Sequence, residues 1–115
     1  MSITRIGVGP RMSQAVVHNG IVYLAGQVAE KPVPSVEKQT RLILAQIDKL
    51  LKQAGSNKSK ILKANIWLSD MRGFAEMNKA WEAWASKGNT PARATVESRL
   101  ATPDYLVEIM VTAAI

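Results

Sequence analysis

The apolar residues near the start of the chain fall in two short runs, 13–17 and 21–25, that are rich in β-forming side chains. The runs are separated by His18-Asn19-Gly20. Asn-Gly between two such runs is the strongest short signal of a β-hairpin. The pattern predicts two antiparallel strands joined by a tight turn. We interpret His18, the single histidine, as a residue at a strand end and not as a catalytic base.

Hydrophobic residues change to helical spacing after the proline-containing link 30–35. Intervals of three and four positions are typical of a helix that is buried along one side. Ser35 can accept a hydrogen bond at the N-terminus of this helix, and Gly55 is a suitable stop. The pattern predicts a helix from Ser35 to about Ala54, with its apolar side formed by Val36, Ile43, Leu44, Ile47, Leu50 and Leu51.

The next segment, 60–70, alternates as a strand does, with Ala64, Ile66 and Leu68 on one face. A second helix is predicted from about Phe74 to Ser86, and Gly88 can end it. Its large residues recur at intervals of three and four, and we assign them to the core rather than to a ligand cage. They are Phe74, Met77, Trp81 and Trp84.

The last two strands lie within PARATVESRLATPDYLVEIMV, residues 91–111. The resulting order, ββαβαββ, predicts one α+β domain over residues 1–115, with both helices on one face of a single sheet. The chain has 115 residues, of which 47% are hydrophobic, which is enough for one packed core.

Charged residues interrupt both of these final strands. If Ala94 and Val96 pack under the helices, alternation sends Arg93 and Glu108 together to the helix-free face. That face would also carry Trp67 and two further apolar residues, Leu106 and Met110. Mixed faces of this kind are often buried against another subunit. The pattern therefore predicts an oligomer whose sheets pack face to face.

A buried guanidinium requires a partner, because an unpaired charge is expensive to remove from water. Two interpretations of Arg93 stay open at this point. It can form a salt bridge with Glu97 or Glu108 that only fixes the interface, or it can bind an anionic ligand. The planar guanidinium is well suited to a carboxylate, and Glu108 could accept a proton or hold a water molecule.

Composition narrows the possible chemistry. The chain has no cysteine and one histidine, so neither a thiol nucleophile nor a metal site is expected. The formal charge of +6 favours anionic partners without choosing among them. Five lysines gather near the end of the first helix, where cations offset the helix dipole; without interleaved aromatic residues, nucleic-acid binding is not expected. They are Lys49, Lys52, Lys58, Lys60 and Lys63.

The N-terminal residues lack an apolar stretch of signal-peptide length, and no segment has transmembrane length. We therefore expect a cytoplasmic protein without a membrane partner.

Several motifs together resemble the Rid (YjgF) family of small enamine and imine deaminases. They are YLAGQVA, ILKANIWLSDMRGFAEMNKAWEAW, PARATVE and LVEIMVTAA, and they cover nearly the whole chain. The most specific is Pro-Ala-Arg followed about fifteen residues later by Val-Glu-Ile. RMSQAVVHNG, FAEMNKAWEAW and TPDYLVEI are more similar to a divergent, YoaB-like branch than to the RidA branch.

The resemblance implies a chorismate-mutase-like fold and a homotrimer whose sheets pack into a central barrel, with ligand clefts between subunits. It implies that Arg93 binds the substrate carboxylate, that Glu108 helps to place the attacking water, that Gly26 lines the cleft and that Asn78 lies near it. The reaction implied is the hydrolysis of a 2-imino acid to a 2-keto acid and ammonia. No metal or organic cofactor is implied.

Three positions of the implied pocket wall depart from the RidA branch. Arg11-Met12 stands where that branch has a tyrosine, Ala25 where it often has a serine, and Thr95 where it has a cysteine. These changes favour a second hypothesis, a non-catalytic trimer that binds a carboxylate metabolite or has a regulatory role. RNA cleavage or translation inhibition is a third hypothesis, which we rank last because a stacking platform is not evident.

Overall fold

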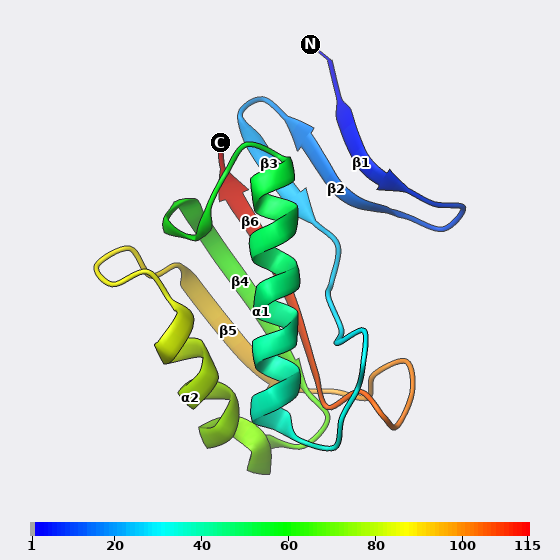
Figure 1. Ribbon diagram of the computed structural model, residues 1–115, viewed down its shortest axis with the longest axis vertical. Helices are drawn as coiled ribbons and strands as arrows, with labels where there is room; N and C mark the ends of the chain where they lie inside the picture. The colour runs from blue at the N-terminus through cyan, green and yellow to red at the C-terminus, as the bar shows by residue number, and fades with distance from the viewer. Residues whose placement is uncertain (1) are drawn as a thin grey trace.

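The structure, a computed structural model, describes residues 2–115 and is built on one six-stranded sheet. The strands are β1 (Thr4–Val8), β2 (Ser13–His18), β3 (Ile21–Leu24), β4 (Ile61–Leu68), β5 (Ala92–Glu97) and β6 (Val107–Ala114). Their order across the sheet is β1-β2-β3-β6-β4-β5 (Figure 1). Strands β4 and β5 pair in parallel, and the other neighbours are antiparallel. The sheet is therefore mixed.

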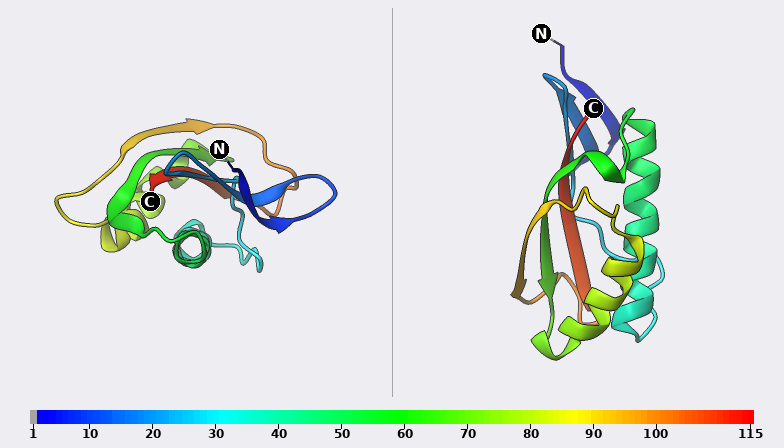
Figure 2. Two further views of the ribbon diagram at one scale, coloured as in Figure 1. Left: turned by 90° about the horizontal axis from the view of Figure 1, so that it is seen from above. Right: turned by 90° about the vertical axis from the view of Figure 1, so that its left-hand side faces the viewer.

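Both helices, α1 (Val36–Gln53) and α2 (Phe74–Trp84), cover the same face of this sheet (Figure 2). The main core lies between this face and the helices, and fully buried residues such as Ile47, Leu68 and Ile109 come from both layers. No element among residues 2–115 covers the opposite face of the central strands. The predicted α+β fold with two helices on one sheet face is thus confirmed. No helix within this range is long and apolar enough to cross a membrane.

The predicted hairpin and helix boundaries follow local backbone chemistry. Asn19 and Gly20 adopt φ values of 52° and 73° between the paired residues His18 and Ile21, as a two-residue hairpin turn requires. His18 lies at the strand end, as predicted, with Nδ1 3.2 Å from the Ser2 carbonyl oxygen.

Helix α1 begins and ends close to the predicted positions. The Ser35 hydroxyl accepts a hydrogen bond from Lys38 N at 3.2 Å, and Gly55 follows the helix with φ 84°. Helix α2 ends at Trp84, two residues before the predicted Ser86, because Ala85 already has extended dihedral angles.

Strand β1 was not predicted, and the observed order is βββαβαββ. Only Ile6 in this strand is even half-buried, so its residues lack the alternation that marks a one-sided strand. The strand exists because it pairs with β2, with Ile6 opposite Ala15. That pairing is a tertiary contact, and the sequence of a short exposed segment does not predict it.

Strand β5 faces the opposite way from the prediction. Its parallel register places Arg93 beside Ala64 and Thr95 beside Ile66, and both β4 residues belong to the helix-facing core. Arg93 and Thr95 therefore lie on the helix side, whereas Val96 is 51% exposed on the other face. The prediction failed because β5 is an edge strand, where α2 leaves room for a long charged side chain and the apolar residues do not have to face inward.

Candidate functional site

Arg93 lies against the rim of helix α2. Its guanidinium carbon is 5.3 Å from the centroid of the Trp81 ring and 5.9 Å from that of Phe74. Nη1 also lies 3.9 Å from the sulfur of Met77. Aromatic faces attract a cation through their quadrupole and leave its N–H groups free to donate in the ring-free directions. The contacts orient the guanidinium without neutralising its charge.

Two further predicted residues lie beside this arginine. Asn78 is half-buried on α2, four positions after Phe74 and three before Trp81, so it shares their side of the helix. Thr95 lies two positions along β5 and shares the face of Arg93. Its Oγ1 is buried and finds no hydrogen-bond partner among residues 2–115. A buried hydroxyl without a partner is unfavourable, so a bound ligand that satisfied it would gain affinity.

The charge of Arg93 has no ion-pair partner within the described part of the chain. The carboxylates of residues 2–115 all lie beyond 4.0 Å from its guanidinium. Glu97 instead accepts a hydrogen bond from Met71 N at 2.9 Å. Burial lowers the pKa of Arg93 from its ordinary value, and the negative charge of Glu82 offsets part of this effect. Of the two interpretations of Arg93, an ion pair with Glu97 or Glu108 is not formed within one chain.

Glu108 lies on the other face of the sheet, in a row with Trp67 and Val96. A Cβ atom added at Gly26 would overlap Glu108 Oε2 and lie 3.1 Å from its carboxyl carbon. Glycine is therefore required at position 26 for the carboxylate to lie against the backbone. Gly26 and Glu108, both predicted site residues, are brought together here.

The structure thus separates the predicted site residues into two groups. The Arg93 region consists of Arg93, Thr95 and Asn78 on the helix side of β5; the Glu108 region consists of Glu108 and Gly26 on the helix-free face. The prediction that Arg93 and Glu108 share the helix-free face was wrong, because the register of β5 with β4 inverts the assumed facing. One chain alone does not bring the two regions together.

The last two predicted residues of the pocket wall, Ala25 and Met12, lie in different segments. Ala25 adjoins Gly26, and its N–H donates to the Gln14 carbonyl oxygen at 2.9 Å. Met12 lies in the connection between β1 and β2, where it is 54% exposed.

The helix-free face is as apolar as predicted at two of its three named positions. Trp67 and Met110 are half-buried on it, and Tyr23 adds a large ring that is 50% exposed. Leu106 was misplaced. It precedes β6 and packs against the core cluster, because strand alternation does not extend into the loop before the strand.

Sequence reasoning missed two contributors to the Arg93 region. Phe74 and Trp81 were assigned to the core, and Trp81 is indeed 5% exposed, but Phe74 is 38% exposed and both rings contact the guanidinium. Phe74 and Trp81 are seven positions apart on one helix, and this spacing was the sequence signal that could have placed both rings on one side of it. No group of three or more His, Asp or Glu side chains within residues 2–115 could hold a metal ion.

Comparison with known proteins shows the family to which this chain belongs. Residues 3–115 match the model of the family described as Endoribonuclease L-PSP. The chain belongs to this family. RutC family protein YoaB of Escherichia coli is 47% identical over 115 residues, covering 100% of both chains. Members of the family also carry the names YjgF and Rid, and the predicted membership is confirmed.

Solved structures of relatives have the same fold. A member of the YjgF family from Neisseria meningitidis, 48% identical, superposes with a TM-score of 0.97 over 99% of this chain and 95% of that one. The Rid-family protein YyfA from Yersinia pestis, of unknown function, is 37% identical with a TM-score of 0.86, covering 94% and 90% of the two chains. These similarities establish the family fold. They leave the reaction of this chain to be argued from its residues.

Proposed function

We propose that this protein hydrolyses reactive 2-imino acids, and the enamines in equilibrium with them, to 2-keto acids and ammonia. The observation that carries the proposal is Arg93, a half-buried guanidinium that is oriented by two aromatic rings and has no carboxylate partner within residues 2–115. A group of this kind suits a small carboxylate ligand, which can accept two parallel hydrogen bonds from it.

The second part of the proposal is a site formed by two subunits. Arg93 and Glu108 project from opposite faces of one sheet, so we propose that the Arg93 region of one subunit meets the Glu108 region of its neighbour in a homotrimer. Packing the helix-free faces into a central barrel would also remove Tyr23 and Val96 from water, which are 50% and 51% exposed in the single chain. Burial of apolar area is the main driving force of such association.

The reaction requires little machinery. With the carboxylate of the imino acid held by Arg93 and Thr95 Oγ1, the Glu108 carboxylate accepts a proton as water adds to C2 of the protonated imine, forming a neutral carbinolamine. The protonated Glu108 then returns this proton to the amine nitrogen. As the C–N bond breaks, Glu108 takes the proton of the C2 hydroxyl, the keto group forms, and the leaving ammonia carries that proton away as ammonium. Fixing the substrate and one water supplies much of the rate increase, and a positioned acid or base contributes about 100-fold to 10,000-fold. No cofactor takes part.

The test is release of keto acid or ammonia from imines that an amino-acid oxidase generates in the assay. We expect the wild type to accelerate the release, and Arg93→Ala to lower kcat/KM by about 100-fold or more through loss of the charge-assisted pair. Arg41→Ala is the matched control, because Arg41 lies on the outer surface of α1 and pairs with Glu37. Lack of acceleration by wild type with small, aliphatic and basic imino acids would contradict the proposal.

A second candidate function is the binding of a carboxylate metabolite without turnover. It is favoured by the separation of the two regions, since Arg93 and Thr95 can hold an anion without help from Glu108. Saturable binding of a 2-keto acid, abolished by Arg93→Ala and unaccompanied by imine hydrolysis, would select this function.

RNA cleavage remains the last of the three hypotheses. Within the basic cluster, Lys58 donates to the Trp84 carbonyl oxygen at 2.7 Å and lies 5.5 Å from the Trp84 ring centroid. These contacts support a structural role for this lysine at the C-terminus of α2, where a cation is favourable.

A further inference from the structure

The pairing between β3 and β6 contains one extra residue beside the Glu108 region. Tyr23 pairs with Thr112, and the next bridge joins Gln27 to Ile109. The chain thus advances four residues on the β3 side and three on the β6 side. An additional residue on one strand is a β-bulge, a device that re-aims the side chains that follow it. We call residues 24–27 the bulge segment.

The extra residue reverses which side chains face the helices. Val22 and Leu24 are buried in the core, so unbroken alternation would turn Gly26 inward next. In the structure Gln27 is the buried residue, at 7% exposure, while the Cα of Gly26 faces the Glu108 carboxylate. The contact between Gly26 and Glu108 therefore exists only because of the bulge.

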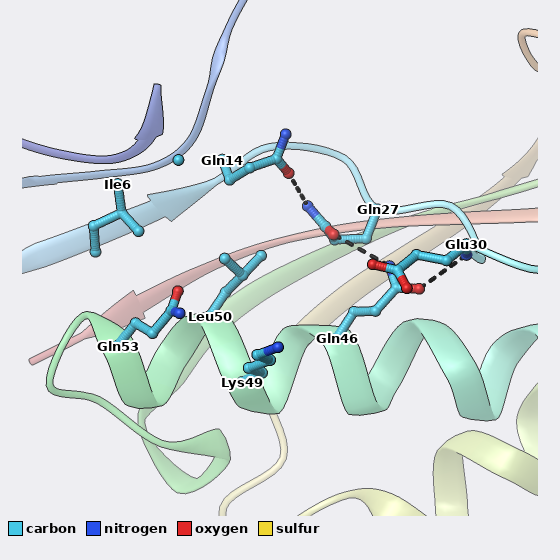
Figure 3. Close-up of a pocket in the computed structure, with 9 residues that line it drawn as sticks. Ile6, Gln14, Gln27, Glu30, Gln46, Lys49, Leu50 and Gln53 are labelled. Carbon is cyan, nitrogen blue, oxygen red and sulfur yellow. Dashed lines mark hydrogen bonds between the residues drawn. The ribbon is translucent and has the colours of Figure 1, made fainter. Parts of the chain in front are cut away.

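The buried amide of Gln27 is held on both sides (Figure 3). Its Nε2 donates to Gln14 Oε1 and to the Ala25 carbonyl oxygen, each at 3.1 Å. Its Oε1 accepts from Gln46 Nε2 at 3.3 Å. Both amide hydrogens and the amide oxygen have partners, as a buried polar group requires. The Gln27 side chain thus joins strand β2, the bulge segment and helix α1.

Gln46 extends this connection along helix α1. Its Nε2 also donates to the Val28 carbonyl oxygen at 3.0 Å, and its Oε1 accepts from Glu30 N at 3.0 Å. The amides form part of the wall of a cavity of about 360 Å³ between α1 and the β1–β2 hairpin. Helix α1 therefore holds the chain directly after the bulge segment through a single side chain.

We propose that Gln27 is the positioning residue of the Glu108 region: the Gln14–Gln27–Gln46 amide chain maintains the bulge that sets Gly26 against Glu108. The backbone of Gln27 exchanges hydrogen bonds with Ile109, N to O at 2.8 Å and O to N at 3.0 Å, directly beside Glu108 in the sequence. Holding Gln27 in place therefore holds the two backbone segments beside the Glu108 carboxylate, at Gly26 and at Ile109. The catalytic part of this inference rests on the proposed imine hydrolysis.

The test replaces the amide with a side chain of similar length that cannot make these hydrogen bonds. In Gln27→Met we expect kcat for imine hydrolysis to fall by about tenfold to 100-fold, because small misplacement of a reacting group is costly. KM should change by less than about threefold, because Arg93, the proposed ligand of the substrate carboxylate, is unchanged. The variant should therefore affect the chemical step and not substrate binding. Loss of folded protein would also lower the apparent kcat at constant KM, so kcat is expressed per folded enzyme, with the folded fraction measured by circular dichroism.

The structural measurement is hydrogen exchange of the Gln27 and Ile109 amides, which we expect to accelerate by about tenfold or more in Gln27→Met through local opening. Gln53→Met is the matched control. Gln53 lines the same cavity but has no side-chain hydrogen bond within residues 2–115, and neither measurement should change. If Gln27→Met does not fold, Gln46→Met removes the α1 end of the amide chain and should show the same pattern.

The two proposals fail in different ways. If exchange at Gln27 and Ile109 stays at the wild-type rate, or if KM rises as much as kcat falls, the positioning role of Gln27 is wrong. If the wild type hydrolyses no imine, the proposed function fails, and the exchange rates alone decide whether the amide chain holds the bulge.

Discussion

The Arg93 region and the Glu108 region place opposite charges in the same sheet by different means. Arg93 stands on β5, the last strand of the sheet, and takes its orientation from side chains of α2. Glu108 stands on β6, between β3 and β4, and lies against backbone at Gly26. An edge strand can turn a long cation toward a helix rim, whereas a carboxylate among central strands needs space made for it by glycine and a bulge.

The difference also bears on assembly. Each region holds one charged group without an ion-pair partner among the described residues, and the sheet itself separates them. A carboxylate ligand at Arg93 therefore does not reach Glu108 of the same chain. If the two regions act together, they must belong to one site contributed by two subunits.

The largest expected effect is recovery of activity in mixed oligomers. Arg93→Ala and Glu108→Gln should each be nearly inactive alone in the imine assay. When the two variants are co-expressed, roughly a quarter of all sites should be restored by random assembly, and about one of the three sites in each mixed trimer, because a heterologous interface combines residues of neighbouring chains.

Recovery is measured as activity per oligomer after purification through a different affinity tag on each variant. A site built within one chain would give no recovery, since every chain then lacks one of the two groups. Co-expression of Arg93→Ala with Arg93→Lys, which share the same defective region, is the control for nonspecific rescue.

A smaller effect is expected from crowding the Glu108 region. The methyl group of Gly26→Ala would overlap Glu108 Oε2, so the carboxylate must move and kcat should fall about tenfold to 100-fold. Because Oε2 is the far end of a flexible side chain that can move at low cost, the free energy of unfolding should fall by less than about 1 kcal/mol, measured by urea denaturation.

The double variant Gly26→Ala/Glu108→Ala separates the causes. Removing the long carboxylate side chain relieves the overlap, so this variant should be as stable as the wild type and as inactive as Glu108→Ala alone. If Gly26→Ala alone keeps full activity, the contact between Gly26 and Glu108 does not constrain the site.

The smallest expected effect comes from a substitution at Thr95 in the Arg93 region. Thr95→Val replaces a buried hydroxyl that has no partner within residues 2–115, so stability should stay constant or rise by about 1 kcal/mol. If the hydroxyl donates to the substrate carboxylate, KM should increase about threefold to tenfold through the lost hydrogen bond. The measurements are thermal unfolding and steady-state kinetics.

Thr40→Val provides the contrast. Thr40 Oγ1 donates to the Val36 carbonyl oxygen at 2.7 Å in the core side of α1, so this variant should lose about 1 kcal/mol of stability. A Thr95→Val variant that is destabilised to the same degree, with unchanged KM, would assign Thr95 to the core instead of the ligand.

Much of the fold was predictable because its signals are local. Asn19-Gly20 specified the hairpin turn, Ser35 and Gly55 bounded α1, and the alternation of Ala64, Ile66 and Leu68 identified β4. Each of these signals depends on residues within a few positions of one another. Strand β1 has no such signal, since it is exposed along most of its length and depends on pairing with β2.

The sequence named candidate site residues, but it did not give their arrangement. The motifs identified Arg93, Glu108, Gly26 and Asn78, and the structure brings Gly26 to Glu108 and Asn78 to the side of α2 that faces Arg93. The aromatic rings under Arg93 and the amide chain through Gln27 were not predicted. Both depend on contacts between elements that are distant in the sequence.

By itself, the sequence determined the residue types, the helices, most of the strands and the family to which the chain belongs. Tertiary structure alone decided the facing of β5 and the bulge beside Gly26. The physical reason is that strand alternation has only two phases, and local composition does not distinguish them on a mixed strand. Pairing with Ala64 selects one phase for Arg93, and one inserted residue reverses the phase between Leu24 and Gln27.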